Sequence, residues 1–509
     1  MPTASRTKKS IHNSLVACLY YVITLFLNFF SRKIFLEYLG TEILGLNTTA
    51  ANILQFLNLA ELGIGSAVGF SLFKPLHEKD YESINEIVSL QGFLYKKIGI
   101  FILLGAIVLM FFFPFIFKKI SLPLWYTYAS FGVLLFSALL GYFVNYKQIL
   151  LSANQQDYKI QYSYRTVILI KVIFQMFSVY YFEDGYIWWL FYEIIFAILG
   201  SISLHYATLK EFPNLRKTKK KYKELKDKYS FLVIKIKQLF FHKIGGFALS
   251  QSSPLIIYAF IDLKEVALYG NYVLITNGVQ MLMVAMFKSI EAGVGDLVAE
   301  GNNKRIKNTF EELFSIRFIL IATLCITTYF FTEAFVKLWI GREYLLPNFT
   351  LLLLVVLLFI FLQRLTVDAF INAYGLFSDI YAPIVEVALN LSLSIIGGNF
   401  WGLNGIIGGV VISQIIIILI WKPYFLFHNK LIGYYPRYLY LFFSHIIIAL
   451  VLGVLFFIFF KSQISYAGTN ILDFIKNSLL ISSAYFIVLS VIFIFLFPKI
   501  KFSLQRIIK

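Results

Sequence analysis

Long apolar runs alternate with short polar segments along the whole chain. Many of these runs reach about 20 residues, which is enough for a helix to cross a hydrocarbon core of about 30 Å. Strands of a membrane barrel would be shorter and would alternate polar with apolar residues. The pattern therefore predicts an all-α polytopic membrane protein. We expect about fourteen transmembrane helices, with approximate limits at 12–36, 43–73, 92–117, 123–150, 161–181, 186–208, 239–261, 266–297, 309–331, 348–374, 380–397, 403–421, 439–460 and 476–497.

A short motif occurs twice in the same position relative to these spans. ELGIGSAV at Glu61–Val68 matches EAGVGDLV at Glu291–Val298. Six predicted spans separate the copies, so both copies have the same orientation, as in a parallel repeat. The repeat predicts two parallel six-helix lobes, at 1–208 and 239–437. Two additional membrane helices and a basic tail then occupy 438–509.

The largest polar segment separates the two predicted lobes. It occupies 209–238 and contains RKTKKKYKELKDK at Arg216–Lys228. We interpret it as a cytoplasmic linker with some helix, in contact with anionic lipid. A regulatory or partner-binding role is the alternative.

Charge sets the orientation of the chain. Only 14% of residues are charged, against about 25% in soluble proteins. With the N-terminus inside, the inner segments carry 32 Lys and Arg residues and the outer loops carry 7. This asymmetry predicts an even number of membrane spans with both termini in the cytoplasm. The net charge of +18 therefore reflects topology, and we expect no nucleic-acid binding because no aromatic and basic module accompanies the lysines.

Motifs for catalysis and metal binding are missing from the sequence. It has no phosphate-binding Gly-Lys loop and no serine nucleophile motif. Its six histidines lack metal spacing, and Cys18 and Cys325 both lie inside apolar runs. We therefore expect no catalytic residue, no metal site and no cofactor, while a coupling proton or sodium ion stays open.

Some basic residues lie inside or beside the apolar runs. Charges at that depth normally face a watery cavity or pair with an opposite charge. A cavity with such cations suits an anionic ligand, because arginine contacts phosphate bidentately and lysine supplies a mobile charge. The candidate substrate-binding residues are Arg32, Lys171, Arg317 and Arg364.

Each of these cations has a structural alternative. Arg32 lies near the outer end of its run, where its side chain can extend to the interface. Lys171 lies in the middle of its run, and its alternative is a pair with Glu193 or Glu61. Arg317 faces either the cavity or the cytoplasmic surface.

Four acidic residues are candidates for balancing these charges or for coupling to an ion: Glu61, Glu193, Glu291 and Asp368. Helical spacing favours pairing, because Asp368 follows Arg364 by four residues and Glu291 follows Lys288 by three. The repetition of Glu61 at Glu291 favours packing and hinge points that face the lobe interface. We expect Glu61 to balance the substrate-binding cations.

The segment Ser31–Leu76 resembles the N-terminal signature of Wzx-type polysaccharide flippases. These belong to the multidrug/oligosaccharidyl-lipid/polysaccharide (MOP) exporter superfamily. The matching elements are an Arg-aliphatic-aromatic exit from the first span, Tyr38-Leu39-Gly40, Gly45-Leu46-Asn47 and Ala60-Glu61-Leu62-Gly63-Ile64-Gly65. The resemblance implies two six-helix lobes around a central cavity. It also implies that the chain flips an undecaprenyl-diphosphate-linked oligosaccharide, and it suggests partnership with membrane lipids and a polysaccharide polymerase machinery.

Two other functions remain open at this point. The first is export of small cationic molecules by a related transporter, which an excess of acidic cavity residues would favour. The second is a membrane polymerase or ligase, which would need a large outer loop that the sequence lacks. The sugar that would be transported, and the energy source, do not follow from the residues.

Overall fold

The computed structural model describes residues 3–61, 64–118, 120–234, 236, 252–376, 379, 381–497 and 499. Every regular element in these ranges is a helix. The chain divides into two compact units, unit 1 at Met1–Ala267 and unit 2 at Leu268–Lys509. The predicted lobe boundary lay earlier, at 208–239. Residues 237–251 lie outside the described ranges, so that boundary stays a prediction.

The elements of unit 1 lie largely at the predicted spans. The predicted span 43–73 is not one helix, because one helix ends at Leu57 and the next α-helix begins at Ile64. The elements are α1 (Thr3–Leu57), η1 (Asn58–Glu61), α2 (Ile64–Glu78), α3 (Tyr81–Phe111), α4 (Phe113–Ile116), α5 (Leu124–Phe143), η2 (Asn145–Gln148), α6 (Ile149–Ala153), α7 (Asp157–Ile160), η3 (Gln161–Arg165), α8 (Thr166–Tyr181), α9 (Gly185–Glu211) and α10 (Tyr222–Lys228).

Helix α1 contains a break at Gly40. Its φ of 79° is a left-handed conformation that favours glycine. Phe35 and Asn47, on either side of the break, both contact Tyr186. The Phe35 ring lies 6.4 Å from the tyrosine ring, and the Asn47 Oδ1 accepts a 2.9 Å hydrogen bond from the Tyr186 hydroxyl. The chain therefore turns back at Gly40, and α1 holds one predicted span before the break and the start of the next after it.

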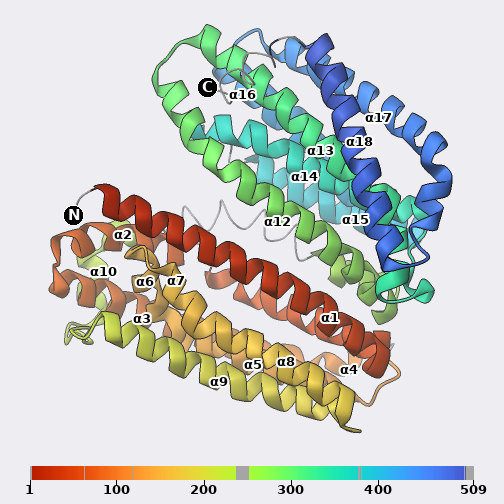
Figure 1. The fold of residues 1–509 in the computed structure, drawn as a ribbon. Helices are drawn as coiled ribbons and strands as arrows, with labels where there is room; N and C mark the ends of the chain where they lie inside the picture. Colours follow the sequence, from red (N-terminus) through yellow and green to blue (C-terminus); the bar gives the residue numbers. More distant parts are fainter. Residues whose placement is uncertain are drawn as a thin grey trace. The chain divides into compact units, whose positions relative to one another are not determined.

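Helices α8 and α9 form a pair that also contacts α1 (Figure 1). Segments α7, η3 and α8 continue without a gap from Asp157 to Tyr181, and η3 is a π-helical turn. Gly200 permits the close approach of α9 at this turn, because a Cβ there would lie 3.1 Å from the Tyr164 ring. The predicted span 161–181 thus lies inside one continuous helical stretch.

The basic linker folds onto the start of α3. We call the segment 214–229 the strap. Its Arg216 and Thr218 backbone N–H groups donate to the Asn85 Oδ1 and the Ser89 Oγ, at 2.9 and 3.1 Å. As expected, this segment contains a short helix, α10.

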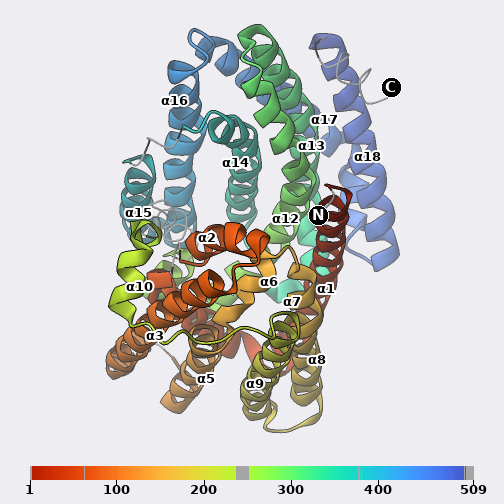
Figure 2. The same cartoon turned by 90° about the vertical axis from the view of Figure 1, so that its left-hand side faces the viewer.

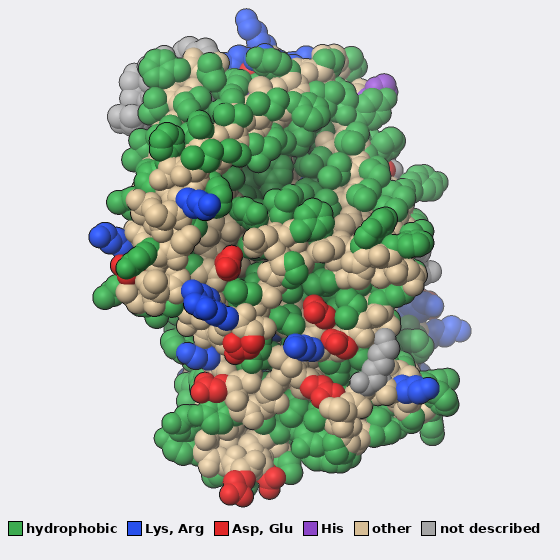
Figure 3. Space-filling view, turned by 90° about the vertical axis from the view of Figure 1, so that its right-hand side faces the viewer, with side chains coloured by type: hydrophobic (Ala, Val, Ile, Leu, Met, Phe, Trp, Pro, Cys, Tyr) green, Lys and Arg blue, Asp and Glu red, His purple; other side chains and the backbone are tan. Residues whose placement is uncertain are grey.

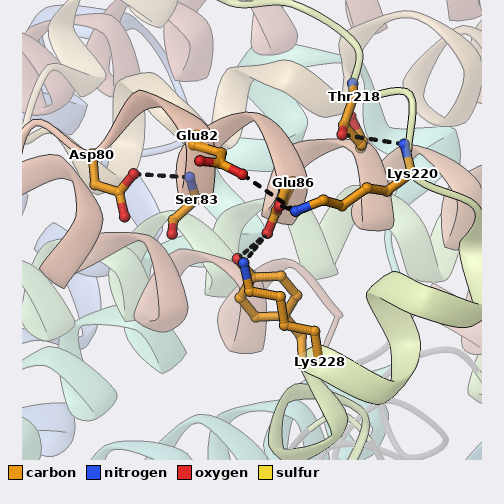
Figure 4. Close-up of polar contacts among 9 residues, drawn as sticks. Asp80, Glu82, Ser83, Glu86, Thr218, Lys220 and Lys228 are labelled. Atoms are coloured by element: carbon orange, nitrogen blue, oxygen red, sulfur yellow. Dashed lines mark hydrogen bonds and ion pairs between the residues drawn. The ribbon is translucent and has the colours of Figure 1, made fainter.

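The carboxylate of Glu86 anchors the strap. Its side chain is only 1% exposed and binds the Lys220 and Lys228 ammonium groups, the latter at 2.6 Å (Figure 4). The Tyr229 hydroxyl donates to the same carboxylate at 2.7 Å. These hydrogen bonds raise the pKa of Lys220 and of Lys228 above the usual lysine value. The lysines of the strap therefore neutralise the buried Glu86 carboxylate, which lies more than 130 residues earlier in the sequence.

Unit 2 begins inside α12 (Leu263–Ala299). Its further elements are α13 (Asn303–Trp339), η4 (Arg342–Tyr344), α14 (Asn348–Ala373), α15 (Tyr381–Gln414), η5 (Ile415–Trp421), α16 (Lys422–Asn429), α17 (Tyr435–Tyr466) and α18 (Ile471–Leu496).

Helix α15 is a tight helical hairpin. Gly402 has a φ of 54°, and the chain reverses there. The two arms touch through glycine, because a Cβ at Gly405 would lie 1.9 Å from the Gly397 carbonyl oxygen. The Ser394 hydroxyl donates to the Ile406 carbonyl oxygen at 2.9 Å across the hairpin. The arms correspond to the predicted spans 380–397 and 403–421.

Helices α17 and α18 pack on α13 (Figures 1 and 2). The rings of Phe318 and Phe493 stack with centroids 5.9 Å apart. His445 is fully buried and lies 2.8 Å from the Ser315 hydroxyl. The two C-terminal helices are thus part of the core of unit 2.

Nine helices among the described residues are long and apolar enough to cross a membrane. Two of these stretches, α1 and the one that begins with α15, each contain a glycine reversal and so hold more than one predicted span. The face drawn in Figure 3 is largely hydrophobic, with charged side chains gathered in limited areas. A large exposed apolar surface on a stable fold indicates contact with lipid. The chain is a multi-pass membrane protein, as predicted.

Candidate functional site

A polar cavity in unit 1 surrounds Glu61. Its volume is about 370 Å³. The short helix η1 ends at Glu61, and α3 and α5 supply the facing side chains. Tyr95 donates a 2.8 Å hydrogen bond to one carboxylate oxygen, and Tyr142 donates a 3.0 Å hydrogen bond to the other. The cavity is lined by Asn58, Glu61, Gly65, Gln91, Tyr95, Ala138, Gly141, Tyr142, Tyr146, Gln148, Ile149 and Ser152.

The second copy of the repeated motif has Glu291 at the position that corresponds to Glu61. Glu291 lies in α12, and its side chain falls outside the described part of the structure. The same holds for Lys288, its predicted i,i+3 partner. The equivalence of Glu61 and Glu291 as packing and hinge points therefore stays a prediction.

Lys171 is paired with an acid from the neighbouring helix. Its ammonium group lies 2.8 Å from the Glu193 carboxylate, and the two side chains are 13% and 10% exposed. Gln175, one turn after Lys171, donates to the same carboxylate at 3.0 Å. Lys171 therefore pairs with Glu193, which the sequence analysis gave as one structural alternative to substrate binding. Its role in substrate binding stays a prediction, and an anionic ligand would compete with Glu193.

Arg32 and Arg317 lie in different units and contact different groups. The Arg32 Nη2 donates to the backbone oxygen of Ala267, the last residue of unit 1, at 3.0 Å. Arg317 is 2% exposed, and its guanidinium lies 4.4 Å from the centre of the Phe287 ring. Arg317 therefore lies in the interior of unit 2 and not at a cytoplasmic surface.

Arg364 and Asp368 form the i,i+4 pair that their spacing predicts, at 3.0 Å. Lys422 at the start of α16 also binds Asp368, at 2.9 Å. Glu386 of α15 is 6% exposed and interacts electrostatically with these charges. The result is a cluster of two bases and two acids inside unit 2. Lys422 was counted as a loop charge in the sequence, and only the packing of α16 on α14 reveals its partner.

Unit 2 also contains a large apolar groove, of about 1000 Å³. Its walls come from α13, α14, α17 and the π-helical segment η5. Leu450, Val454 and Phe457 line the α17 side and are partly exposed. Two ammonium groups, of Lys337 and Lys461, lie where α13 and α17 approach their C-terminal ends. We call this cavity the unit-2 groove.

Tyr95, Tyr142 and the unit-2 groove were not identified from the sequence. Tyrosines are frequent in this chain, so no local signal distinguishes the two that bind Glu61. A groove between helices depends on how their side chains pack, which the apolar pattern does not encode. Among the described residues, no group of three or more His, Cys, Asp or Glu side chains is placed to hold a metal ion.

No protein-family model and no curated protein sequence matches this chain. Solved structures do match it. The chain is similar to lipid II flippase MurJ in an inward closed conformation, at 15% identity and a TM-score of 0.67, over 95% of this chain and 99% of that one. It is also similar to an inward-facing multidrug resistance MATE family transporter of the MOP superfamily, at 14% identity and a TM-score of 0.58, over 81% and 96%.

A third similar structure is the Vibrio cholerae MATE transporter VcmN, in a mutant form. Here the identity is 14% and the TM-score 0.52, over 85% of this chain and 99% of that one. Identities this low establish a shared fold and nothing more. The predicted fold class is confirmed, because the chain has the all-α polytopic fold of MurJ and the MATE transporters.

Proposed function

We propose that this chain is a flippase that translocates undecaprenyl-diphosphate-linked oligosaccharide repeat units across the bacterial cytoplasmic membrane, for the synthesis of a cell-surface polysaccharide. The unit-2 groove is the observation that carries this proposal. A polyprenyl chain needs a continuous apolar surface while its polar head crosses the membrane. The groove offers about 1000 Å³ lined mainly by aliphatic and aromatic side chains.

The shared fold and the N-terminal signature support the same function. The solved structure with the TM-score of 0.67 carries the name of a lipid II flippase. The segment Ser31–Leu76 resembles Wzx-type flippases. Both observations support a lipid-linked saccharide as the substrate. Neither observation identifies its sugars.

The proposal also needs basic residues that bind the diphosphate and acidic residues that balance their charge. Lys337 and Lys461 at one end of the groove suit a diphosphate joined to the lipid. Arg32, Lys171, Arg317 and Arg364 remain candidate substrate-binding residues, with Glu193 and Asp368 balancing two of them. Transport then proceeds by alternating access, as a secondary-type transporter and not as an enzyme.

The cellular setting is part of the proposal. Both termini lie in the cytoplasm, and the flipped repeat units pass to a polysaccharide polymerase machinery outside. The test is deletion of the gene in its own host, with sorting of the lipid-linked repeat units by leaflet. We expect them to accumulate in the inner leaflet while surface polysaccharide falls. Unchanged surface polysaccharide would contradict the proposal.

Export of small cations is the second candidate function. The Glu61 cavity favours it, because a carboxylate lies there and no Lys, Arg or His is among the lining residues. The unit-2 groove has no role in that function. Uptake of ethidium into vesicles that contain the purified protein separates the two candidates, and we expect none.

A further inference from the structure

The Glu61 cavity is much larger than a single ion or water molecule needs. Its volume of about 370 Å³ lies in the range of about 300–1,000 Å³ that is usual for small-molecule sites. One water molecule takes up about 30 Å³ in the liquid. The cavity is a partly open pocket and not an enclosed void. Its size and access therefore suit a small organic group.

The Glu61 carboxylate is the charged group in the lining of this cavity. None of the lining residues is a Lys, Arg or His. Glu193 and Asp368 differ, since both bind ammonium or guanidinium groups. The two oxygens of Glu61 accept hydrogen bonds from the hydroxyls of Tyr95 and Tyr142. A phosphate group would be repelled by the carboxylate and would find no cation, so the cavity does not suit a diphosphate.

Three amide side chains, those of Asn58, Gln91 and Gln148, line the same cavity. Gln91 is 1% exposed, and its Oε1 has no hydrogen-bond partner among the described residues. Its Nε2 donates to the Tyr146 carbonyl oxygen at 3.3 Å, which orients the amide. A buried acceptor without a donor is unfavourable, and a ligand hydroxyl would supply the donor. Hydroxyls suit this lining generally, because a hydroxyl can donate to a carboxylate or an amide oxygen and can accept from an amide N–H.

Three tyrosine rings also line the cavity. The rings of Tyr95 and Tyr146 stack with centroids 6.2 Å apart, and the Tyr142 ring lies 5.6 Å from that of Tyr95. Gly92 leaves space for the Tyr146 hydroxyl, because a Cβ at Gly92 would lie 2.9 Å from it. An aromatic ring has an apolar face, while the tyrosine hydroxyl stays polar. A sugar ring has matching surfaces, since its C–H groups lie on its faces and its hydroxyls surround its edge.

We propose that the Glu61 cavity binds one neutral sugar unit of the transported oligosaccharide. Glu61 and Gln91 accept hydrogen bonds from its hydroxyls, Gln148 fixes its orientation, and the tyrosine rings pack against its C–H groups. The source of the sugar rests on the proposed function. The site deepens that function, because it separates recognition of the sugar from binding of the diphosphate.

The test is equilibrium dialysis of the purified full-length protein in detergent against a tritium-labelled oligosaccharide. The probe is the host's own repeat unit, released from its lipid carrier and dephosphorylated. We expect saturable binding to the wild type. Gly141→Leu should weaken the affinity by more than about tenfold, because Gly141 lines the cavity and an added Cβ meets no atom within 4 Å. Gln148→Leu should weaken it by about threefold to tenfold, through the lost hydrogen bonds.

Gly132→Leu is the matched control for Gly141→Leu. Gly132 lies on the same helix α5, an added Cβ there also meets no atom within 4 Å, and Gly132 is not part of the cavity lining. Gln463→Leu, at an exposed position of α17 in unit 2, is the control for Gln148→Leu. Both controls should bind the oligosaccharide like the wild type. If Gly141→Leu does not purify as a folded protein, Gln148→Leu decides the question.

Absence of saturable binding to the wild type overturns the proposal, and so does equal affinity in Gly141→Leu and Gly132→Leu. The free oligosaccharide carries no lipid, so its binding is measured separately from translocation. A wild type that translocates the complete lipid-linked substrate and does not bind the free oligosaccharide overturns the sugar site alone. A wild type that binds the oligosaccharide at this cavity and does not translocate the complete substrate supports the site and overturns the proposed function.

Discussion

Lys171 and Glu193 show how a charge in a membrane helix is accommodated at the scale of single residues. Their pair has a 2.8 Å contact and both side chains are at most 13% exposed. Removing one partner of a buried pair leaves the other charge without compensation, which typically costs about 3–5 kcal/mol. Replacing both partners by neutral groups costs less, because no charge is left behind. The pair can therefore be tested separately from any role in binding substrate.

Lys171→Met should lower the thermal stability strongly, and the double variant Lys171→Met/Glu193→Gln should recover part of the loss. A double-mutant cycle of thermal midpoints in detergent measures the coupling. If Lys171 also binds the substrate diphosphate, the double variant is stable and yet inactive in polysaccharide display. Additive losses from the two single changes would refute the pair as a structural unit.

The sequence predicted one charge contact within a helix and missed most of those between helices. The pair of Arg364 and Asp368 follows from i,i+4 spacing alone. The third member, Lys422, lies 54 residues from Asp368 and was assigned to a loop. The two tyrosines that bind Glu61 likewise come from α3 and α5. Contacts of this range require knowledge of which helices are neighbours.

At the scale of elements, the α15 hairpin depends on glycine where its arms touch. A Cβ at Gly405 would lie 1.9 Å from the Gly397 carbonyl oxygen, which forces the arms apart. We expect Gly405→Ala to lower the thermal midpoint by several degrees, equivalent to about 1–3 kcal/mol for overpacking. Gly408→Ala, on the same arm with open space around the added Cβ, is the control. Equal midpoints for the two variants would argue against the hairpin.

The strap gives a second prediction at this scale. Glu86→Gln removes the charge that holds Lys220 and Lys228, so we expect trypsin to cut the strap at its lysines much faster than in the wild type. Glu82→Gln is the control, because Glu82 is 75% exposed and contacts Lys220 alone at 3.2 Å. Limited proteolysis followed by mass spectrometry identifies the cut sites. If trypsin cuts Glu86→Gln as slowly as the wild type, contacts other than Glu86 hold the strap on α3.

Several predicted spans agree closely with single helices. Segments 309–331 and 348–374 lie inside or nearly inside α13 and α14. The docking of the basic linker on α3 was not predicted, because it depends on a buried glutamate inside a polar segment that reads as solvent-exposed. The packing of α17 and α18 on α13 was not predicted either. The length of an apolar run is enough to predict a membrane helix. Which helices pack beside it depends on how their side chains fit together.

At the scale of the whole molecule, the unit-2 groove connects the fold with the proposed substrate. Val454 lines the groove and is 58% exposed, so a larger side chain there fills the groove without disturbing a packed core. Val454→Trp should reduce surface polysaccharide about tenfold or more at an equal protein level. Val491→Trp is the control, because Val491 is also exposed, at 46%, and lies on α18 away from the groove lining. Equal display from the two variants would remove the groove from the mechanism.

The most direct test of the proposed function is translocation of a fluorescent undecaprenyl-diphosphate-linked oligosaccharide in vesicles that contain only this protein. Exposure of the labelled head to a membrane-impermeant quencher measures how many molecules have changed leaflet. We predict that labelled heads become accessible to the quencher rapidly in vesicles with the wild type or with Val491→Trp. They should become accessible slowly in vesicles with Val454→Trp and in empty vesicles. Equal rates in wild-type and empty vesicles would contradict the account.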